Sequence, residues 1–429
     1  MSKYDNASLV QIPSGYKENN LYSVLPANGD GDFTFSRNSI ATRVNSDGLI
    51  EQVAANVPRL NYPILNGVVQ SCPALLLEPA RTNLIPYSSD FSNAAWVKVA
   101  ATVTSASAIS PDGTNNAWKF QGNGSGTTVR AYEGLDLTAD TTHYLSVFAK
   151  KGTNNYIRLL FSGFDGSSSG GYNLDAGTAV GDNASIIDYG NGWYKCVLFA
   201  NITSPDVSGT LNIYVSKSDT VTPFDDTTEA SNAYVYVYAA QLEAGSYATS
   251  YIPTSGSTVA RAAEVCGGAG TSAEFNDSEG VLFAEISALA DDLTVRTISI
   301  SNGSSTNRVQ LAFTTTSQQV QTIVSAGTVS FSSTKTIQNT LDYNKLAVKY
   351  KTDDFAFWIN GFKYAVGTGA TPTGINQLRF AAGGGASNFY GKTKQTIAFD
   401  AALTDEQLED LTSWDSFEEL AASQFYTLY

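Results

Sequence analysis

Apolar and polar side chains alternate along most of this chain with the two-residue period of a β-strand. Turns rich in Gly, Asn and Asp separate the alternating segments, the clearest of which lie at residues 142–149, 156–161, 192–199, 211–215 and 233–238. Because the side chains of a strand point alternately to its two faces, each segment predicts a half-buried strand. Strands at such regular spacing are typical of a β-sandwich, so we predict a jelly-roll module over residues 83–256.

A second strand-rich region covers residues 274–404. The segments 345–350 and 355–359 are apolar stretches on either side of a polar turn, and Asn360-Gly361 directly after them is a strong type I′ turn signal. A two-residue turn of this kind joins adjacent antiparallel strands. The pattern therefore predicts a second antiparallel sandwich.

Three shorter segments complete the chain. Residues 1–82 contain only short strands and turns and cannot bury a core of their own. We therefore expect this segment to pack against the next module or against another chain. Residues 257–273 are rich in Gly, Ala, Ser and Thr and are predicted to be a linker. Residues 405–429 are predicted to form a short acidic helical tail, because capping boxes occur at 404–407 and 416–419.

The predicted fold class is therefore all-β: an N-terminal β-rich segment, two antiparallel β-sandwich or jelly-roll modules, and short C-terminal helices. The composition agrees with this class. Charged residues make up 15% of the chain, aromatic residues 11%, and there are 36 glycines. Sheets favour aromatic side chains and turns favour glycine, so the bias predicts many strands joined by many turns.

The charge balance excludes several classes of partner. A formal net charge of −15 argues against nucleic acid and against an anionic membrane surface, since both require clusters of Lys and Arg. No apolar run reaches the roughly 18 residues that a membrane span needs, so we expect no membrane insertion.

The first five residues are polar with no apolar segment behind them, from which we expect no signal peptide. Cys72, Cys196 and Cys266 are predicted to be free thiols.

The sequence offers little material for catalysis, and we predict that the chain is not an enzyme. His143 is the single histidine and lies in an alternating strand, where a structural role is favoured. Residues 166–170 match a nucleophile pattern, G-x-S-x-G, but no histidine follows them. Adjacent acids at 225–226, 291–292 and 353–354 lie in predicted turns and are interpreted as solvated, with structural Ca²⁺ binding as the alternative. No cofactor is otherwise expected.

Aromatic side chains are abundant enough to suggest binding. Trp118, Trp193 and Trp358 lie in strand-like stretches. For any single ring, packing in the core is the favoured interpretation. The functional alternative is stacking on a sugar ring, so these three residues are the candidate ligand-binding residues.

Two long strings in the N-terminal half resemble a module of phage virion proteins. The first is FSR followed by ATRVN and GLIE, within residues 35–51, and the second is PALLLEPARTNLI, residues 73–85, followed by aromatic residues up to Trp96. Both are similar to tail and fibre proteins of phages that infect Bacteroidetes, including crAss-like phages. Residues 239–254 resemble the closing strand and exit loop of the same module.

The two predicted sandwiches also carry resemblances. The body of the first is similar to a carbohydrate-binding-module jelly roll, in which an acid on the last strand can join a structural Ca²⁺ site, and Glu243 is the matching position. Residues 274–412 resemble a concanavalin-like lectin or glucanase (LamG-like) domain. The hairpin at 357–361 and the string ALTDEQ at 402–407 carry this resemblance. Catalytic members of that fold carry a strand of closely alternating acids. No such strand occurs here, so the resemblance implies a binding or structural sandwich.

Together these resemblances imply a structural fibre protein of a phage virion, on the tail or the head, that presents glycan-binding sandwiches to the host surface. Such a protein is made in the host cytoplasm and resides in the virion. Its expected partners are other virion proteins, a host surface glycan, and further copies of itself in a homotrimer. The alternatives are a virion decoration or joining protein without a ligand, a bacterial surface glycan-binding protein, and a glycan-degrading enzyme.

Overall fold

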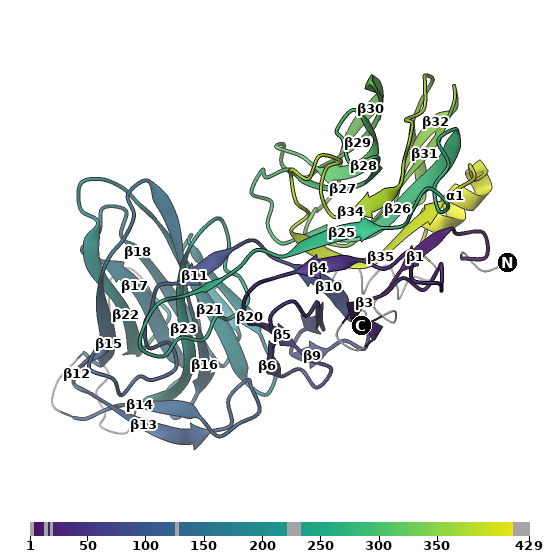
Figure 1. Ribbon diagram of the computed structural model, residues 1–429. Helices are drawn as coiled ribbons and strands as arrows, with labels where there is room; N and C mark the ends of the chain where they lie inside the picture. Colours follow the sequence, from purple (N-terminus) through teal and green to yellow (C-terminus); the bar gives the residue numbers. More distant parts are fainter. Residues whose placement is uncertain (1–3, 13–15, 18–19, 125–127, 221–232, 415–429) are drawn as a thin grey trace.

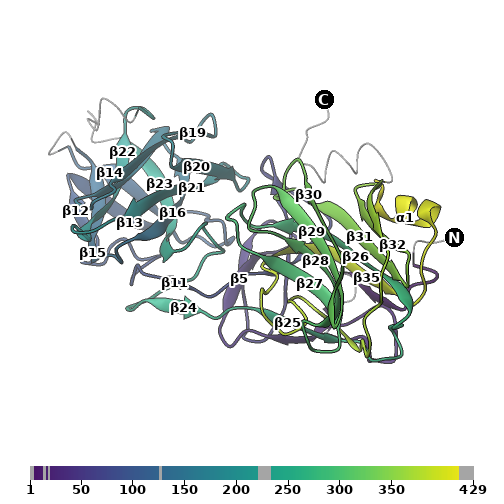
Figure 2. The same cartoon turned by 90° about the horizontal axis from the view of Figure 1, so that it is seen from above.

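The computed structural model describes residues 4–12, 16–17, 20–124, 128–220 and 233–414. Within these ranges the chain forms 35 strands and one α-helix, so the predicted all-β class is confirmed. The strands build two β-sandwiches that lie side by side (Figures 1 and 2). No helix in the described ranges has the length and apolar character needed to cross a membrane.

The first sandwich consists of two six-stranded antiparallel sheets from the middle of the chain. One sheet has the order β12 (Val97–Val99), β15 (Arg130–Asp136), β22 (Ser208–Ser216), β17 (Tyr156–Ser162), β18 (Ser168–Asn173), β19 (Thr178–Val180). The other has the order β13 (Ala101–Ala108), β14 (Ala117–Gly122), β23 (Tyr234–Ala244), β16 (Thr141–Lys151), β21 (Trp193–Ile202), β20 (Ala184–Asp188). We call this unit the jelly roll.

Alternation along the strands decides which side chains enter the core of the jelly roll. On β16, Leu145, Val147 and Ala149 point inward, while Phe148 between them points to the outer face. The same period places Leu211 and its alternate neighbours on β22 in the core. The two-residue pattern in the sequence therefore corresponds to burial on one face of each sheet.

The second sandwich, which we call the C-terminal sandwich, combines strands from both ends of the chain. Its first sheet has the order β33 (Phe362–Gly367), β32 (Phe355–Ile359), β31 (Asn344–Lys351), β26 (Glu279–Ala288), β35 (Gly391–Phe399), β10 (Ala74–Leu77), β7 (Arg59–Asn61), and β1 (Leu9–Gln11) also pairs with β35. Its second sheet has the order β30 (Thr328–Thr336), β29 (Gln319–Ala326), β28 (Asn307–Phe313), β27 (Arg296–Ser301), β34 (Gln377–Arg379), β25 (Val265–Ala269), β4 (Thr34–Ser36).

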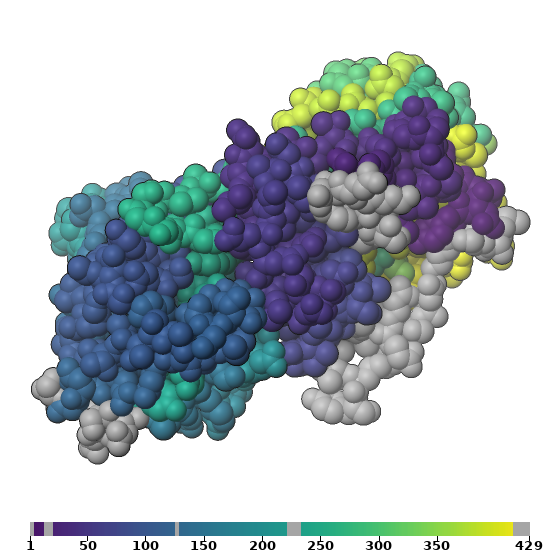
Figure 3. All heavy atoms as spheres, turned by 60° about the horizontal axis from the view of Figure 1, so that its bottom comes forward, coloured from purple at the N-terminus to yellow at the C-terminus, as the bar shows by residue number. Residues whose placement is uncertain are grey.

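The N-terminal segment is therefore part of the C-terminal sandwich. In the register of the sheets, Leu75 faces Thr393 and Leu9 faces Ala398, and both leucines are buried in the core. The partner surface that residues 1–82 were expected to need is thus supplied by the same chain. A short strand becomes stable here because it extends an existing sheet and adds apolar side chains to the core between the two sheets. Figure 3 shows this segment lying across the junction of the two sandwiches.

The segment expected to be a linker, residues 257–273, contains two strands. β24 (Val259–Arg261) pairs with β11 (Arg81–Asn83), and β25 joins the second sheet of the C-terminal sandwich. The small residues that suggested a linker permit close packing, since a Cβ at Gly267 would lie 2.9 Å from the side chain of Arg379. Composition alone did not distinguish this strand from a loop.

Three short hairpins and one helix complete the fold. The hairpins are β2 (Tyr16–Lys17) with β3 (Asn20–Leu21), β5 (Ala41–Val44) with β6 (Ile50–Val53), and β8 (Ile64–Leu65) with β9 (Val68–Val69). The helix α1 (Asp405–Thr412) begins at the predicted capping box, where Thr404 accepts from the Gln407 amide and Gln407 accepts from the Thr404 amide. The second predicted capping box, 416–419, lies outside the described residues. Cys72 is exposed, and Cys196 and Cys266 are buried free thiols.

Candidate functional site

Trp193, one of the three tryptophans proposed from the sequence, is buried at a contact between two parts of the fold. It lies on the outer face of β21 and packs with Phe148, Tyr238 and Ile50 of the β5–β6 hairpin. Its indole N–H donates to the Ile109 carbonyl at 2.9 Å. Only 2% of its surface is exposed, so this ring holds the N-terminal segment against the jelly roll and offers no face to a ligand.

The other two tryptophans are also occupied by packing. Trp358 is 4% exposed and lies on the first sheet of the C-terminal sandwich, beneath Leu408 and Leu411 of α1. Trp118 is half-buried against the core of the jelly roll, and its indole N–H donates to the Ser89 carbonyl at 2.7 Å. The structure does not bring the three rings together in one place, because they lie on three different strands of two sandwiches.

Glu243, the proposed Ca²⁺ ligand, has both carboxylate oxygens engaged by protein donors. Oε1 accepts from the Thr249 amide at 2.8 Å and from Gln241 Nε2 at 2.6 Å, and Oε2 accepts from the Thr249 hydroxyl at 2.6 Å. Arg81 Nε lies 3.8 Å from Oε2. These bonds attach the exit loop of the jelly roll, residues 245–254, to its last strand, β23. In the described part of the chain, no three His, Cys, Asp or Glu side chains are grouped closely enough to hold a metal ion.

The other groups considered for chemistry are held in structural contacts. The His143 ring is buried, its Nδ1 lies 3.1 Å from the Thr141 carbonyl, and burial lowers its pKa. Asp292 pairs with Arg296 at 2.6 Å, and Asp354 with Lys349 at 2.8 Å. The remaining adjacent pair, 225–226, lies outside the described residues.

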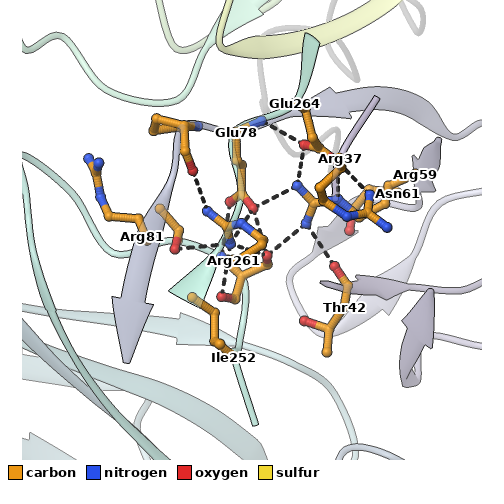
Figure 4. A network of polar contacts seen from close by, with 12 residues as sticks. Arg37, Thr42, Arg59, Asn61, Glu78, Arg81, Ile252, Arg261 and Glu264 are labelled. Carbon is orange, nitrogen blue, oxygen red and sulfur yellow. Dashed lines mark hydrogen bonds and ion pairs between the residues drawn. The ribbon is translucent and has the colours of Figure 1, made fainter. Parts of the chain in front are cut away.

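A buried network of three arginines and two glutamates lies where the N-terminal segment, the exit loop and β24 meet (Figure 4). Glu264 accepts from Arg37 at 2.8 Å and from Arg59 at 2.8 and 2.5 Å. Glu78 lies 2.9 Å from Arg59 and 2.9 Å from Arg261. Every one of these five side chains is at most 4% exposed, so the ion pairs are shielded from solvent.

Backbone groups and hydroxyls satisfy the rest of the network except Arg261 Nε, which has no partner among the described residues. Arg37 donates to the carbonyls of Ser39, Val57 and Ala54. The Ser250 amide and hydroxyl donate to Glu78 at 2.9 and 2.6 Å. A buried ion pair is tolerated only when further hydrogen bonds complete it, and this network meets that condition at both glutamates and at Arg37.

The electrostatics of the network fix its charge state. Burial by itself would raise the pKa of Glu78, but Arg261, Arg59 and the bonds from Ser250 outweigh it and hold that pKa far below the ordinary value. Burial would likewise lower the pKa of Arg59, and the two glutamates reverse the effect and raise it. The strings that resemble phage proteins contain Arg37, Glu78 and Arg81. Two of them, Arg37 and Glu78, belong to this network and thus have a structural role.

One sheet of the jelly roll has polar and aromatic side chains on its outer side, of which Arg130 and Tyr132 are partly exposed and Asn212, Tyr214 and Arg158 are buried. On β15, Arg130 and Tyr132 alternate with the core residue Ala131 and point outward. Asn212 and Tyr214 on β22 lie beside them, in the register Arg130–Tyr214 and Tyr132–Asn212. We call these four residues, with Arg158 on β17, the arginine–tyrosine face.

Hydrogen bonds and ring contacts hold this face in order. Arg130 Nη1 donates to the Tyr214 hydroxyl at 3.0 Å and to Asn212 Oδ1 at 3.3 Å. The Arg130 guanidinium lies 5.1 Å from the centre of the Tyr132 ring and 5.7 Å from that of Tyr214. Arg158 lies 5.9 Å from the Tyr214 ring and donates to Ser169 at 2.6 Å. Arg130 Nε is buried and has no hydrogen-bond partner among the described residues.

Sequence reasoning missed the arginine–tyrosine face because it looked for tryptophans. The signal present in the sequence was the polar residues at the outward-pointing positions of three alternating strands. These are Arg130 and Tyr132 on one strand, Arg158 on another, and Asn212 and Tyr214 on a third. Alternation shows that such residues share a face within one strand. Which strands are neighbours was not readable from it.

Comparisons with known proteins give partial structural similarities. No family model matches the chain. No curated protein matches it. Among solved structures, the carbohydrate-binding module CBM40 of the Ruminococcus gnavus IT-sialidase, bound to α2,3-sialyllactose, is similar at 16% identity over 32% of this chain and 84% of its own, with a TM-score of 0.27. Domain 4 of the Geobacillus stearothermophilus arabinanase AbnA, in complex with arabinotriose, is similar at 12% identity over 39% of this chain and 82% of its own, with a TM-score of 0.27.

A third similar structure is the NanB sialidase of Streptococcus pneumoniae, at 13% identity over 32% of this chain and 25% of its own, with a TM-score of 0.27. All three similarities concern about a third of the chain. At these identities and TM-scores they assign neither a ligand nor an activity to it.

Proposed function

We propose that this chain is a non-enzymatic structural protein of a phage particle, a tail or head fibre, that binds a host glycan through its jelly roll. The observation that supports the binding role is the Arg130 guanidinium. It lies between Tyr132 and Tyr214 on an outer sheet face, where Arg130 and Tyr132 are both partly exposed.

The chemistry of this face suits a sugar. Tyrosine rings stack against the apolar faces of sugar rings, while a guanidinium donates hydrogen bonds to hydroxyl or carboxylate oxygens in a fixed planar geometry. The bonds from Arg130 to Tyr214 and Asn212 fix the guanidinium before a ligand arrives. Preorganisation of this kind reduces the entropy lost on binding.

Support for the virion role comes from the two strings in the N-terminal half that resemble phage tail and fibre proteins. The N-terminal segment was expected to dock to the particle and to need another chain. Because four of its strands complete the C-terminal sandwich, that reason for a homotrimer no longer applies. The trimer and the other virion proteins remain predicted partners, through surfaces of the assembled sandwich.

Glycan arrays and host capsular polysaccharide, probed with the purified full chain, test the binding role. We expect binding that falls at least tenfold in Arg130→Ala and in Tyr132→Ala and is unchanged in Lys335→Ala, an exposed residue on β30 of the other sandwich. An absence of binding to any glycan would favour the decoration or joining protein. Release of reducing ends from the capsule would instead favour the glycan-degrading enzyme.

Electron microscopy of particles labelled with an antibody to this chain tests the virion role. Labelled tails or heads are expected, and mass photometry of the purified chain measures its oligomeric state. A label found on the surface of uninfected bacteria and absent from particles would favour the bacterial glycan-binding protein.

A further inference from the structure

A cleft of about 280 Å³ lies beside the buried network, where the three parts of the chain meet. The N-terminal segment contributes Asn61 and Tyr62, the jelly roll contributes Tyr189, Lys195 and Tyr247, and the C-terminal sandwich contributes Lys392. It is separate from the arginine–tyrosine face, which lies on the other sheet of the jelly roll. Its volume is near the lower end of small-molecule sites, about 300 Å³, and so suits a monosaccharide.

Positive charge is in excess around this cleft. Among the described residues of the junction, five cations (Arg37, Arg59, Arg261, Lys195, Lys392) face two anions (Glu78, Glu264), an excess of three. The neighbouring Glu243–Arg81 pair is neutral as a unit. This excess contrasts with the net charge of −15 for the whole chain.

The two lysines carry two of the three excess charges, and the network of arginines and glutamates carries the third. Lys195 Nζ donates to the Thr249 carbonyl at 2.7 Å, a neutral acceptor. The Lys392 ammonium makes no hydrogen bond or ion pair with the described residues, and Glu78 is the anion whose charge it senses. Burial lowers the pKa of both lysines, with Glu78 opposing it at each and Glu243 also opposing it at Lys195. An ammonium in such a position gains from an anion placed beside it.

The other walls of the cleft are aromatic and are fixed in place. The Tyr189 ring packs edge-on against Phe148 with centroids 4.8 Å apart, and the Arg81 guanidinium lies 5.4 Å from the centre of the Tyr247 ring. Asn61 Oδ1 accepts from the Val44 amide at 2.9 Å, which orients the amide group of this side chain. Rings with polar groups between them are the usual walls of a sugar site.

We propose that this cleft binds a sugar that carries a carboxylate, a hexuronic acid residue of a polysaccharide, with the carboxylate at Lys392 and Lys195 and the ring against the tyrosines. The two ammonium groups supply the charge for the carboxylate. The volume excludes a long oligosaccharide from the interior, so one acidic residue enters and the rest of a polymer remains outside. Since all three parts of the chain line the cleft, the ligand also fastens the two sandwiches together.

Calorimetry on the full chain with D-glucuronate, D-glucose and acetate tests this inference. We expect glucuronate to bind with a Kd of about 1 mM or below, as is usual for a ligand of its size, and glucose and acetate to bind at least tenfold more weakly. Lys392→Met, which removes the charge and keeps most of the stem, should weaken glucuronate at least tenfold. Lys392→Arg should restore it, and Lys335→Met should leave it unchanged.

Three results would overturn the proposal: no heat with glucuronate at 10 mM, equal affinity for acetate, or undiminished binding in a Lys392→Met protein with the parental melting temperature. The Arg130→Ala variant separates this site from the proposed function. If it retains glucuronate binding, the cleft is the site. If it abolishes glucuronate binding while Lys392→Met does not, the sugar is bound on the arginine–tyrosine face and the cleft proposal fails alone.

Discussion

Glu78 and Glu264 are separated in the sequence by the whole jelly roll, and two hydrogen bonds join them, one from backbone to side chain and one from backbone to backbone. The Glu78 amide donates to the Glu264 carboxylate at 2.8 Å, and the Glu264 amide donates to the Glu78 carbonyl at 3.1 Å. Next to them Arg81 pairs with Arg261 in the β11–β24 ladder. The chain thus leaves the C-terminal sandwich and returns to it at one point, and the jelly roll is an insertion in that sandwich.

Removing the carboxylate of Glu264 is expected to destabilise the whole protein. In Glu264→Gln the Arg37 guanidinium remains buried without a counter-charge and Arg59 keeps only Glu78, which costs about 3–5 kcal/mol of the free energy of unfolding. Urea unfolding followed by tryptophan fluorescence measures the loss. The control is Glu51→Gln, which breaks the half-exposed pair with Arg43 and should cost less than about 1 kcal/mol. Equal effects of the two variants would contradict a central role for the network.

The jelly roll should be removable as a unit. Because β11 and β24 are paired strands, a short Gly/Ser connection from Asn83 to Val259 bridges neighbouring chain ends without strain. We expect the shortened protein to keep a cooperative melting transition, and the excised piece 84–256 to fold on its own core. By contrast, residues 274–414 alone lack β1, β4, β7, β10 and β25 and should give no protected amides in hydrogen exchange. A folded 274–414 piece would show that the N-terminal strands are dispensable.

Trp193 and Arg130 should separate stability from binding. Trp193→Ala removes a buried ring from the contact with the β5–β6 hairpin and should lower the free energy of unfolding by about 3–5 kcal/mol, with glycan affinity kept at a temperature where the protein is folded. Arg130→Ala should instead lower the glycan affinity and leave the free energy of unfolding nearly unchanged. Thermal melts paired with binding curves for both variants decide the matter. Loss of affinity in Trp193→Ala with an unchanged melt would return this ring to the binding site.

Glu133 should make stability depend on pH. It is 4% exposed, points toward the core of the jelly roll, and its Oε2 has no hydrogen-bond partner among the described residues. Burial raises its pKa from 4.5 to about 7. Between these values the unfolded chain has released the proton that the folded chain still holds, so the free energy of unfolding falls as pH rises, by about 3 kcal/mol in total.

The variant Glu133→Gln cannot titrate and should lack this contribution between pH 4.5 and 7. Its advantage over the parent protein should therefore grow with pH across that window and level off above pH 7. Urea midpoints at half-unit intervals measure the difference. Glu406→Gln, at an exposed position in α1, is the control and should run parallel to the parent. A difference between Glu133→Gln and the parent that does not vary with pH would contradict the raised pKa.

Calcium should leave the melting temperature unchanged. Both oxygens of Glu243 accept hydrogen bonds from Thr249 and Gln241, so an ion would have to displace donors already in place. Melts in 5 mM CaCl₂ and in 5 mM EDTA are expected to coincide. A calcium-dependent rise that disappears in Glu243→Gln would restore the metal site implied by the resemblance to carbohydrate-binding modules.

The sequence by itself determined the local features of this protein. Alternation at Leu145 and its neighbours predicted a strand with one buried face, and the capping box at Thr404 predicted the start of α1. These features depend on residues a few positions apart, whose side chains and backbone meet within one strand or one helical turn. For the same reason the all-β class was readable from the chain.

Only the tertiary structure decided which distant segments meet. Nothing local in Leu75 specifies that it pairs opposite Thr393, and nothing in Trp193 specifies that a hairpin at Ile50 covers it. A strand carries no mark of its neighbour, because any edge of matching length and apolar face can accept it. The insertion of the jelly roll, the buried charges and the assembly of Arg130 with Tyr214 all follow from such long-range pairing, and for that reason the candidate site emerged from the fold.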